Sequence, residues 1–151
     1  MIPVRCLVFQ LLSDGLTTGV CCQKVVEAEA MVDHGITDIL LSNQIVDDSK
    51  IARLAALSVR GASISVLVDS AHNAGQLSRE ANLQGVIFGV LIEVDVGQNR
   101  CGVPTVEEAV HLGRVVDALP GLRLLGIQAY HGASQHVRSV CERRAIGMII
   151  L

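Results

Sequence analysis

VLIEVDVGQNRCGV, residues 90–103, joins an apolar run to two carboxylates, an arginine and two glycines. The mostly β-branched run up to Gly97 predicts a buried β-strand whose C-terminal end carries the polar chemistry. Glu93 and Asp95 are two positions apart and therefore point to the same face of this strand. Because carboxylates inside a strand need partners, we expect those partners to come from the ends of neighbouring strands, where α/β enzymes gather reacting groups.

Arg100 follows the predicted strand in a loop that contains Gly97 and Gly102, where glycine allows the backbone to approach a ligand closely. Two interpretations of these charges remain open. Either the loop and the carboxylates contact a bound molecule, or Arg100 forms an ion pair that ties the loop to the strand.

Segments on both sides of residues 90–103 repeat the succession of an apolar strand and an amphipathic helix. The strands are predicted at residues 18–22, 36–42, 63–68, 86–96 and 122–130. The helices are predicted to follow Gln23, Asp47 or Asp48, Ser70 and Thr105, and to end at Gly35, Gly61, Gly85 and Pro120. A repeat of roughly 25 to 35 residues without hairpin signals requires parallel strands joined by right-handed crossovers. The fold class is therefore α/β, with about five parallel βα units of a partial (β/α)8 TIM barrel.

Polar residues fall at or just beyond the C-terminal ends of the predicted strands. In a (β/α)8 barrel this edge of the sheet is the catalytic face. We therefore expect these residues to gather at one edge and to form the site. They are Gln23, Asn43, Asp69, Arg100 and Tyr130 with His131.

The composition fits a parallel sheet that is buried on both faces or lacks some of its neighbours. Half of the 151 residues are hydrophobic, 18% are charged, and the mean hydropathy is +0.49. This length suits one domain or a piece of a larger barrel. The net charge of −3 and the 2% aromatic content argue against a nucleic-acid partner. No apolar run approaches the roughly 18 residues that suggest a membrane helix, so we expect no membrane partner and a cytoplasmic location.

The five cysteines form no CxxC pair, which argues against a disulfide framework and against a zinc ribbon. We interpret them as buried free thiols in a reducing compartment. His34, His72 and His111 fall in predicted helices and are expected at the surface. The cysteines are Cys6, Cys21, Cys22, Cys101 and Cys141.

Three segments in the same order resemble the D-threonine aldolase family, which includes 3-hydroxyaspartate aldolases and D-serine dehydratases and is alanine-racemase-like. They are TGVCCQKVVEAEAMVDHGITDILLSN at residues 18–43, VLIEVDVGQNRCGV at residues 90–103 and GIQAYHGASQH at residues 126–136. The resemblance runs from about residue 10 to residue 144. It implies a single partial barrel domain of alanine racemase N-terminal type over residues 1–151, without the family's C-terminal β domain.

The resemblance also implies the chemistry. The family's lyases depend on pyridoxal 5′-phosphate (PLP) and on a divalent metal, manganese or zinc. They cleave a small-molecule D-3-hydroxy amino acid to glycine, or a glyoxylate-derived product, and an aldehyde, and they are homodimers.

By the same resemblance, Arg100 lies beside the cofactor ring, Tyr130 faces the ring from its strand end, and Gln23 lies near the floor of the pocket. His131 is either a pocket residue or a structural histidine at a strand end, and His136 is expected to open a helix, where it could be exposed. Their five-residue separation does not suit a helical metal pair, so no metal ligand is assigned in this chain. The full set of pocket candidates is Asn43, Asp69, His131 and Gln135.

The chain departs from the family at the lysine that forms the Schiff base with PLP. Its two lysines, Lys24 after a predicted strand and Lys50 in an outer helix, do not stand in the family's His-Ala-Lys motif. We interpret both as solvated and assign no catalytic residue. The family's metal ligands are also missing from this sequence, and its last run, ERRAIGMIIL at residues 142–151, is a predicted helix without a cap. We expect a truncated piece that is inactive alone and whose dimerisation is doubtful.

Three alternatives remain beside a truncated aldolase. A D-serine dehydratase-like lyase would expel the β-hydroxyl group instead of cleaving the carbon chain. A non-catalytic PLP-binding protein would keep the barrel. An interaction protein would use the exposed edge of an open parallel sheet.

Overall fold

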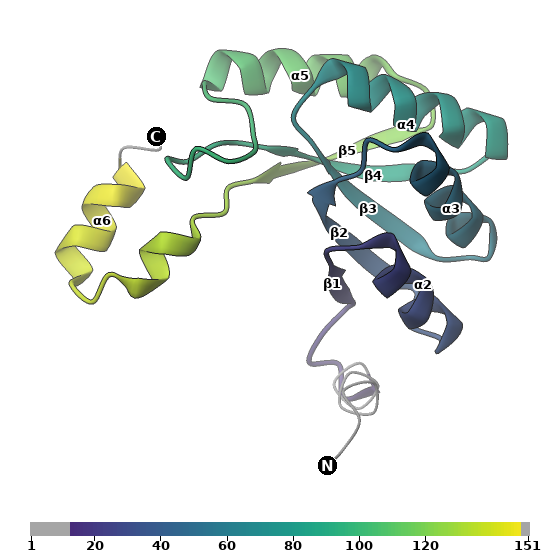
Figure 1. Cartoon of the computed structure of the whole chain (residues 1–151), viewed down its shortest axis with the longest axis horizontal. Helices are drawn as coiled ribbons and strands as arrows, with labels where there is room; N and C mark the ends of the chain where they lie inside the picture. The colour runs from purple at the N-terminus through teal and green to yellow at the C-terminus, as the bar shows by residue number, and fades with distance from the viewer. Residues whose placement is uncertain (1–12, 149–151) are drawn as a thin grey trace.

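The computed structural model describes residues 13–148. Strands and helices alternate along most of the chain (Figure 1). The elements are β1 (Val20–Cys22), α2 (Val25–Asp33), β2 (Asp38–Gln44), α3 (Asp48–Val59), β3 (Ser63–Val68), α4 (Ala71–Gln84), β4 (Phe88–Glu93), α5 (Val106–Ala118), β5 (Leu122–Gln128), the 3₁₀ helix η1 (Gly132–His136) and α6 (Val140–Met148). Cys6 and the end of the predicted terminal helix lie outside the described residues.

The five strands form one parallel sheet in the order β1-β2-β3-β4-β5, which confirms the predicted α/β class and its parallel pairing. Strands that follow one another in the sequence are also neighbours in the sheet. This is the order of a (β/α)8 barrel, because a doubly wound sheet reverses its strand order at a switch point. Within residues 13–148, β1 and β5 each pair with a single strand, so the sheet is open and forms part of a barrel.

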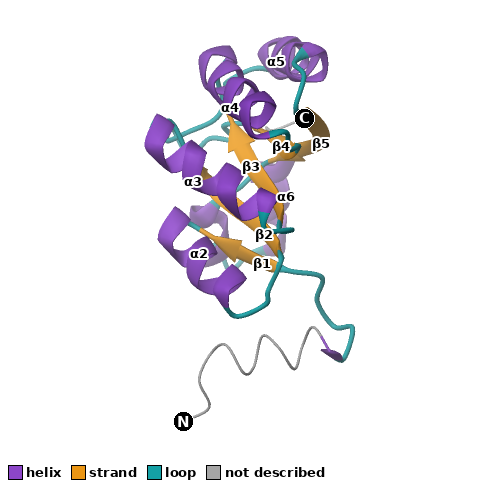
Figure 2. Cartoon of the chain, turned by 90° about the vertical axis from the view of Figure 1, so that its right-hand side faces the viewer, coloured by secondary structure: helices purple, strands orange, loops and turns teal. Residues whose placement is uncertain are grey.

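Helices α2 to α5 lie along one face of the sheet (Figure 2). Ile64, Val66 and Val90 are fully buried and belong to the hydrophobic core that also includes residues of these helices. Removal of this apolar surface from water stabilises the fold by roughly 25 cal/mol per Å². The strand residues that alternate with them point to the opposite face, where Ser42 and Ser65 are half-buried.

Three helices begin at side-chain caps that the sequence supplies. Asp47, Ser70 and Thr105 each accept a hydrogen bond from the backbone N–H three residues later, at 3.0, 3.2 and 3.1 Å. Such caps satisfy N–H groups that have no partner inside the helix. Asp47 rather than Asp48 is therefore the cap of α3, and Gly85 ends α4 in the left-handed conformation with φ of 66°.

The predicted strand at residues 86–96 is longer than the strand in the structure. β4 ends at Glu93, and Val94 forms only an isolated bridge to Val103. Asp95 lies beyond the strand because its Oδ1 accepts hydrogen bonds from consecutive backbone N–H groups and turns the chain. The donors are Gly97, Gln98 and Asn99, at 3.0, 2.9 and 3.0 Å.

Three other strands also differ from the predicted ranges at their ends. β1 begins at Val20 rather than at residue 18, and β2 runs from Asp38 to Gln44 instead of over residues 36–42. The pairing of β2 with β3 begins with Asp38 opposite Ser63, so the strand starts where its neighbour allows the ladder to start. β5 ends at Gln128, and Tyr130 follows in the next loop.

The prediction of buried cysteines is wrong for two of the four that the structure describes. Cys22 is buried and Cys101 is half-buried, but Cys21 and Cys141 are exposed, and all four are free thiols. Cys21 is exposed because successive strand residues point to opposite faces, and only Cys22 points to the core.

Part of the high hydropathy is apolar surface on the last strand. Leu125 and Ile127 on β5 are 47% and 66% exposed. None of the helices within residues 13–148 combines the length and the apolar character needed to cross a membrane. His34, His72 and His111 are exposed, as predicted.

Candidate functional site

A cavity of about 340 Å³ lies at the carboxyl ends of the strands, against the loop that follows β4. Ligand pockets in proteins have volumes of about 300–1,000 Å³. The cavity brings together four residues that the sequence analysis singled out, and three that it did not. The first group is Gln23, Asn43, Arg100 and Tyr130, and the second is Cys21, Ser42 and Gln128.

The side chains of Arg100 and Tyr130 contact each other at the wall of the cavity. The Arg100 Cζ atom is 5.9 Å from the centroid of the Tyr130 ring, within the range of a cation–π contact. The Tyr130 hydroxyl oxygen accepts a hydrogen bond from Gln135 Nε2 at 3.3 Å. Gln135 therefore contacts the site through Tyr130, although it does not line the cavity.

Glu93 connects the end of β4 to two neighbouring parts of the site. Its side chain is 5% exposed, its Oε2 accepts a hydrogen bond from Gln44 Nε2, and its Oε1 is 3.9 Å from Arg100 Nη2. Gln44 is the last residue of β2, so one partner comes from another strand end, although β3 separates this strand from β4 and the predicted partner strand was an adjacent one. The ion pair between loop and strand is also present. The contact of residues 90–103 with a bound molecule stays a prediction.

The loop that carries Arg100 is fixed by backbone contacts. Asp69 Oδ2, at the end of β3, accepts a hydrogen bond from the Gly102 N–H at 3.1 Å. Gly102 has a φ of 107°, and a Cβ atom there would lie 2.5 Å from the Asp95 nitrogen, so a side chain would collide with the backbone. Asp69 therefore holds the loop and does not line the cavity.

His131 and His136 lie in the segment after β5. His131 Nδ1 accepts a hydrogen bond from the Ser134 N–H at 3.2 Å and caps η1, which matches the structural interpretation of this histidine. His136 was expected to open a helix, but it is the last residue of η1, and it is exposed. Gln98 Oε1 accepts a hydrogen bond from the Gly132 N–H at 3.2 Å and joins this segment to the Arg100 loop.

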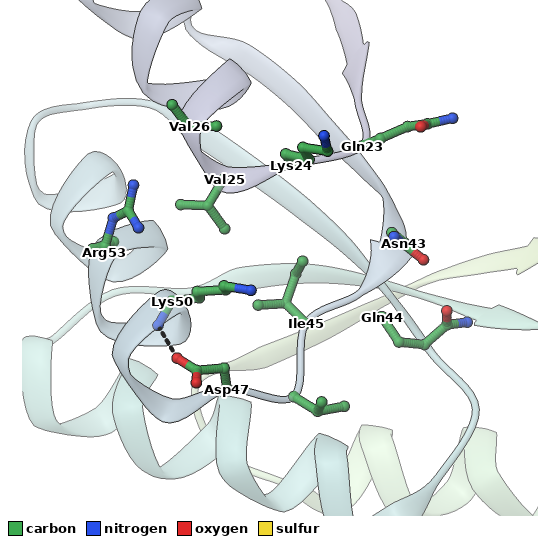
Figure 3. Close-up of a pocket in the computed structure, with 11 residues that line it drawn as sticks. Gln23, Lys24, Val25, Val26, Asn43, Gln44, Ile45, Asp47, Lys50 and Arg53 are labelled. Atoms are coloured by element: carbon green, nitrogen blue, oxygen red, sulfur yellow. Dashed lines mark hydrogen bonds between the residues drawn. The ribbon is translucent and has the colours of Figure 1, made fainter.

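Both lysines line a second pocket of about 430 Å³ beside the first (Figure 3). Lys24 stands at the N-cap position of α2, where its side chain makes no capping hydrogen bond, and Lys50 lies in the first turn of α3. Neither lysine lines the Arg100 cavity. Gln23 and Asn43 line both pockets, and Arg53 of α3 also lines the second one.

Cys22 and Glu29 are among the ionisable groups near this edge whose pKa values are shifted. Burial, helped by the charges of Glu27 and Cys21, raises the pKa of the Cys22 thiol to about 11, so this thiol is protonated at neutral pH. Hydrogen bonds from Arg53 to both Glu29 carboxylate oxygens, at 2.7 and 2.6 Å, lower the pKa of Glu29. Within residues 13–148, no three His, Cys, Asp or Glu side chains come together in a way that could hold a metal ion.

The alanine racemase N-terminal domain family matches residues 6–145. A 3-hydroxy-D-aspartate aldolase of Paracoccus denitrificans (strain Pd 1222) is 45% identical over 131 residues, which cover 87% of this chain and 34% of that protein. A D-threonine aldolase of an Arthrobacter species is 47% identical over 128 residues, which cover 85% of this chain and 34% of that protein. The crystal structure of D-threonine aldolase from Filomicrobium marinum has a TM-score of 0.83 and 45% identity, over 87% of this chain and 35% of that chain.

A more distant relative, the D-threo-3-hydroxyaspartate dehydratase of Delftia sp. (strain HT23), is 27% identical over 140 residues and is covered over 36% of its length. The chain thus spans about a third of the length of the curated relatives it matches. The family match extends over residues 6–145 and includes every strand of the sheet. The chain belongs to the alanine racemase N-terminal domain family.

Proposed function

We propose that this chain is part of a PLP-dependent lyase that cleaves a D-3-hydroxy amino acid between Cα and Cβ. The observation that carries the proposal is the meeting of Gln23, Arg100 and Tyr130 around one cavity, in a chain 45–47% identical to D-threonine and 3-hydroxy-D-aspartate aldolases. These three residues come from the end of β1, the loop after β4 and the loop after β5. They are the residues that the family resemblance assigned to the cofactor.

The cavity suits the ring portion of PLP. Arg100 offers a cation with several N–H donors, Tyr130 offers an aromatic face and a hydroxyl group, and Gln23 offers an amide. When bound, PLP supplies an electron sink for the negative charge that develops at Cα. Arg100 would set how much of this charge the ring takes up, and Tyr130, held by Gln135, would orient the bound molecule.

Two features of the family, the lysine that binds PLP and the metal ligands, are not matched by residues that line this cavity. Neither Lys24 nor Lys50 lines it, so no covalent attachment is assigned to this chain. The manganese or zinc of the family would hold the substrate's hydroxyl group, but residues 13–148 contain no cluster suited to it, and no step is assigned to a metal here.

Dehydration is the second candidate reaction, and the 27% identical dehydratase supports it less strongly than the aldolases support cleavage. The products distinguish the two reactions. Cleavage of 3-hydroxyaspartate gives glycine and glyoxylate, whereas dehydration gives an enamine that hydrolyses to oxaloacetate and ammonia.

A chimera tests the lyase proposal because this chain spans about a third of its relatives. Residues 13–148 would replace the matched segment of the Arthrobacter D-threonine aldolase. We expect the chimera to bind PLP and to release glycine from D-threonine. Arg100→Met in the chimera should lower kcat about 100-fold, as loss of one oriented charge-stabilising donor does.

Arg114→Met is the matched control, because Arg114 is exposed on α5. A folded, PLP-loaded chimera that releases no glycine would contradict the proposal. Equal activity of the Arg100→Met and Arg114→Met chimeras would contradict the role of Arg100.

A further inference from the structure

Glu93 is the one buried carboxylate among the described residues. A buried carboxylate is costly unless hydrogen bonds or an opposite charge replace the lost water. Its two oxygens have different partners. Oε2 accepts a hydrogen bond from Gln44 Nε2, and Oε1 lies 3.9 Å from Arg100 Nη2.

The contact between Gln44 and Glu93 crosses over β3, because Gln44 ends β2 and Glu93 ends β4. The register of β2 shifts between Leu41 and Gln44 and places Gln44 opposite Leu67. Leu67 pairs with Leu91, which is two residues before Glu93 and points to the same face. In Figure 3 the Gln44 side chain points away from Lys50. The strand ends thus bring amide and carboxylate together on the cavity side of the sheet.

Arg100 has little else to hold it. Its side chain is 55% exposed on a loop, and its other side-chain contact among the described residues is the face of Tyr130. A long arginine side chain loses rotamer freedom when it is fixed, so it needs a fixed partner to stay in one place. Glu93 provides this partner, since its carboxylate is buried and is itself held by Gln44.

We propose that Glu93 is a positioning residue for Arg100, and that Gln44 orients its carboxylate for this purpose. The inference deepens the proposed function and rests on it for the identity of the ligand. Arg100 then acts as an oriented donor paired with a carboxylate rather than as a free positive charge. Gln44 and Glu93 affect the bound molecule through Arg100.

The positioning role and a purely electrostatic role of Glu93 predict opposite effects of Glu93→Gln on the affinity for PLP. Glu93→Gln removes one negative charge from beside the cavity, so electrostatics alone would strengthen the binding of the phosphate-bearing PLP. Loss of a positioned Arg100 would instead weaken that binding, by about tenfold if one charge-assisted hydrogen bond is lost. The chain has one tyrosine and no tryptophan, so quenching of Tyr130 fluorescence by added PLP reports binding at this cavity.

A ligand-free measurement separates this inference from the proposed function. The Nε–H signal of Arg100 in ¹⁵N NMR spectra of the whole chain, assigned with Arg100→Lys, reports whether the side chain is fixed. We expect a fixed signal in the unchanged chain, a mobile one in Glu93→Gln and in Gln44→Met, and no change in Glu107→Gln. Glu107 is the matched control because it is exposed in the first turn of α5. If Glu93→Gln does not fold, Gln44→Met carries the test.

The outcomes are distinct. An Arg100 signal that is the same in all folded variants, or PLP binding that tightens in Glu93→Gln, would overturn the positioning role. Failure of the unchanged chain to bind PLP, with Arg100 released by Glu93→Gln and Gln44→Met, would overturn the cofactor assignment and support the positioning role.

Discussion

Gly102→Ala should destabilise the chain strongly, because the Arg100 loop packs directly against the backbone after β4. An alanine Cβ at this position would lie 2.5 Å from the Asp95 nitrogen, 2.6 Å from the Val94 carbonyl carbon and 3.1 Å from the Glu93 oxygen. These atoms belong to the backbone and cannot rotate away. The φ of 107° adds a conformational penalty of about 1–2 kcal/mol, and crowding adds about 1–3 kcal/mol. We expect a total loss of about 2–5 kcal/mol in the free energy of unfolding.

Two other glycines separate the conformational penalty from the crowding penalty. Gly61 has a φ of 96°, and a Cβ atom there would have nothing within 4 Å, so Gly61→Ala should cost about 1–2 kcal/mol from conformation alone. Gly75 lies inside α4 with open space for a Cβ atom and no positive φ, so Gly75→Ala should stabilise by up to about 1 kcal/mol. Urea unfolding followed by far-ultraviolet circular dichroism measures all three. A loss for Gly102→Ala no larger than that for Gly61→Ala would refute the close packing of the loop.

Other parts of the structure give three further expectations. Thr105→Ala should lower the free energy of unfolding by about 1 kcal/mol in the same urea assay, because it removes the cap of α5; an unchanged value would contradict the cap. The raised pKa of the Cys22 thiol predicts that it reacts slowly with a thiol reagent below about pH 11, while the exposed Cys21 reacts readily. The same raised pKa predicts that the free energy of unfolding falls as the pH rises from about 9 to about 11, because the Cys22 thiol ionises at a lower pH in the unfolded chain than in the folded one. The 151-residue chain with added PLP and Mn²⁺ should release no glycine from D-threonine, because Lys24 and Lys50 both line the neighbouring pocket, and glycine release would show that the reaction centre is misplaced.

The periodic features of the sequence were sufficient for the fold class. The apolar runs predicted the five strands, and the capping residues with the closing glycines predicted the helices between them. The C-terminal end of β4 was not predictable from periodicity, since Asp95 continues the alternation of apolar and polar residues. Asp95 leaves the strand because its carboxylate accepts hydrogen bonds from the backbone N–H groups of Gly97, Gln98 and Asn99.

The meeting of the candidate residues at one cavity was predictable from strand order, but the contacts around the cavity were not. Parallel strands end at one edge, which is why Gln23, Asn43, Arg100 and Tyr130 meet there. Gln44 was missed because its partner, Glu93, is 49 residues away in sequence, and only the folded sheet brings them together. The expected pocket residue Asp69 contacts Gly102 instead of the cavity for a similar reason, because the path of the loop decides what its carboxylate meets.

The most direct test of the account is a PLP titration followed by the fluorescence of Tyr130, the single tyrosine of a chain without tryptophan. Because Tyr130 lines the cavity with Arg100, bound PLP should quench its emission with a saturable dependence on concentration. We expect Arg100→Met to weaken this binding and Arg114→Met to leave it unchanged. Quenching that never saturates, or that is the same in both variants, would contradict the assignment of this cavity to the cofactor.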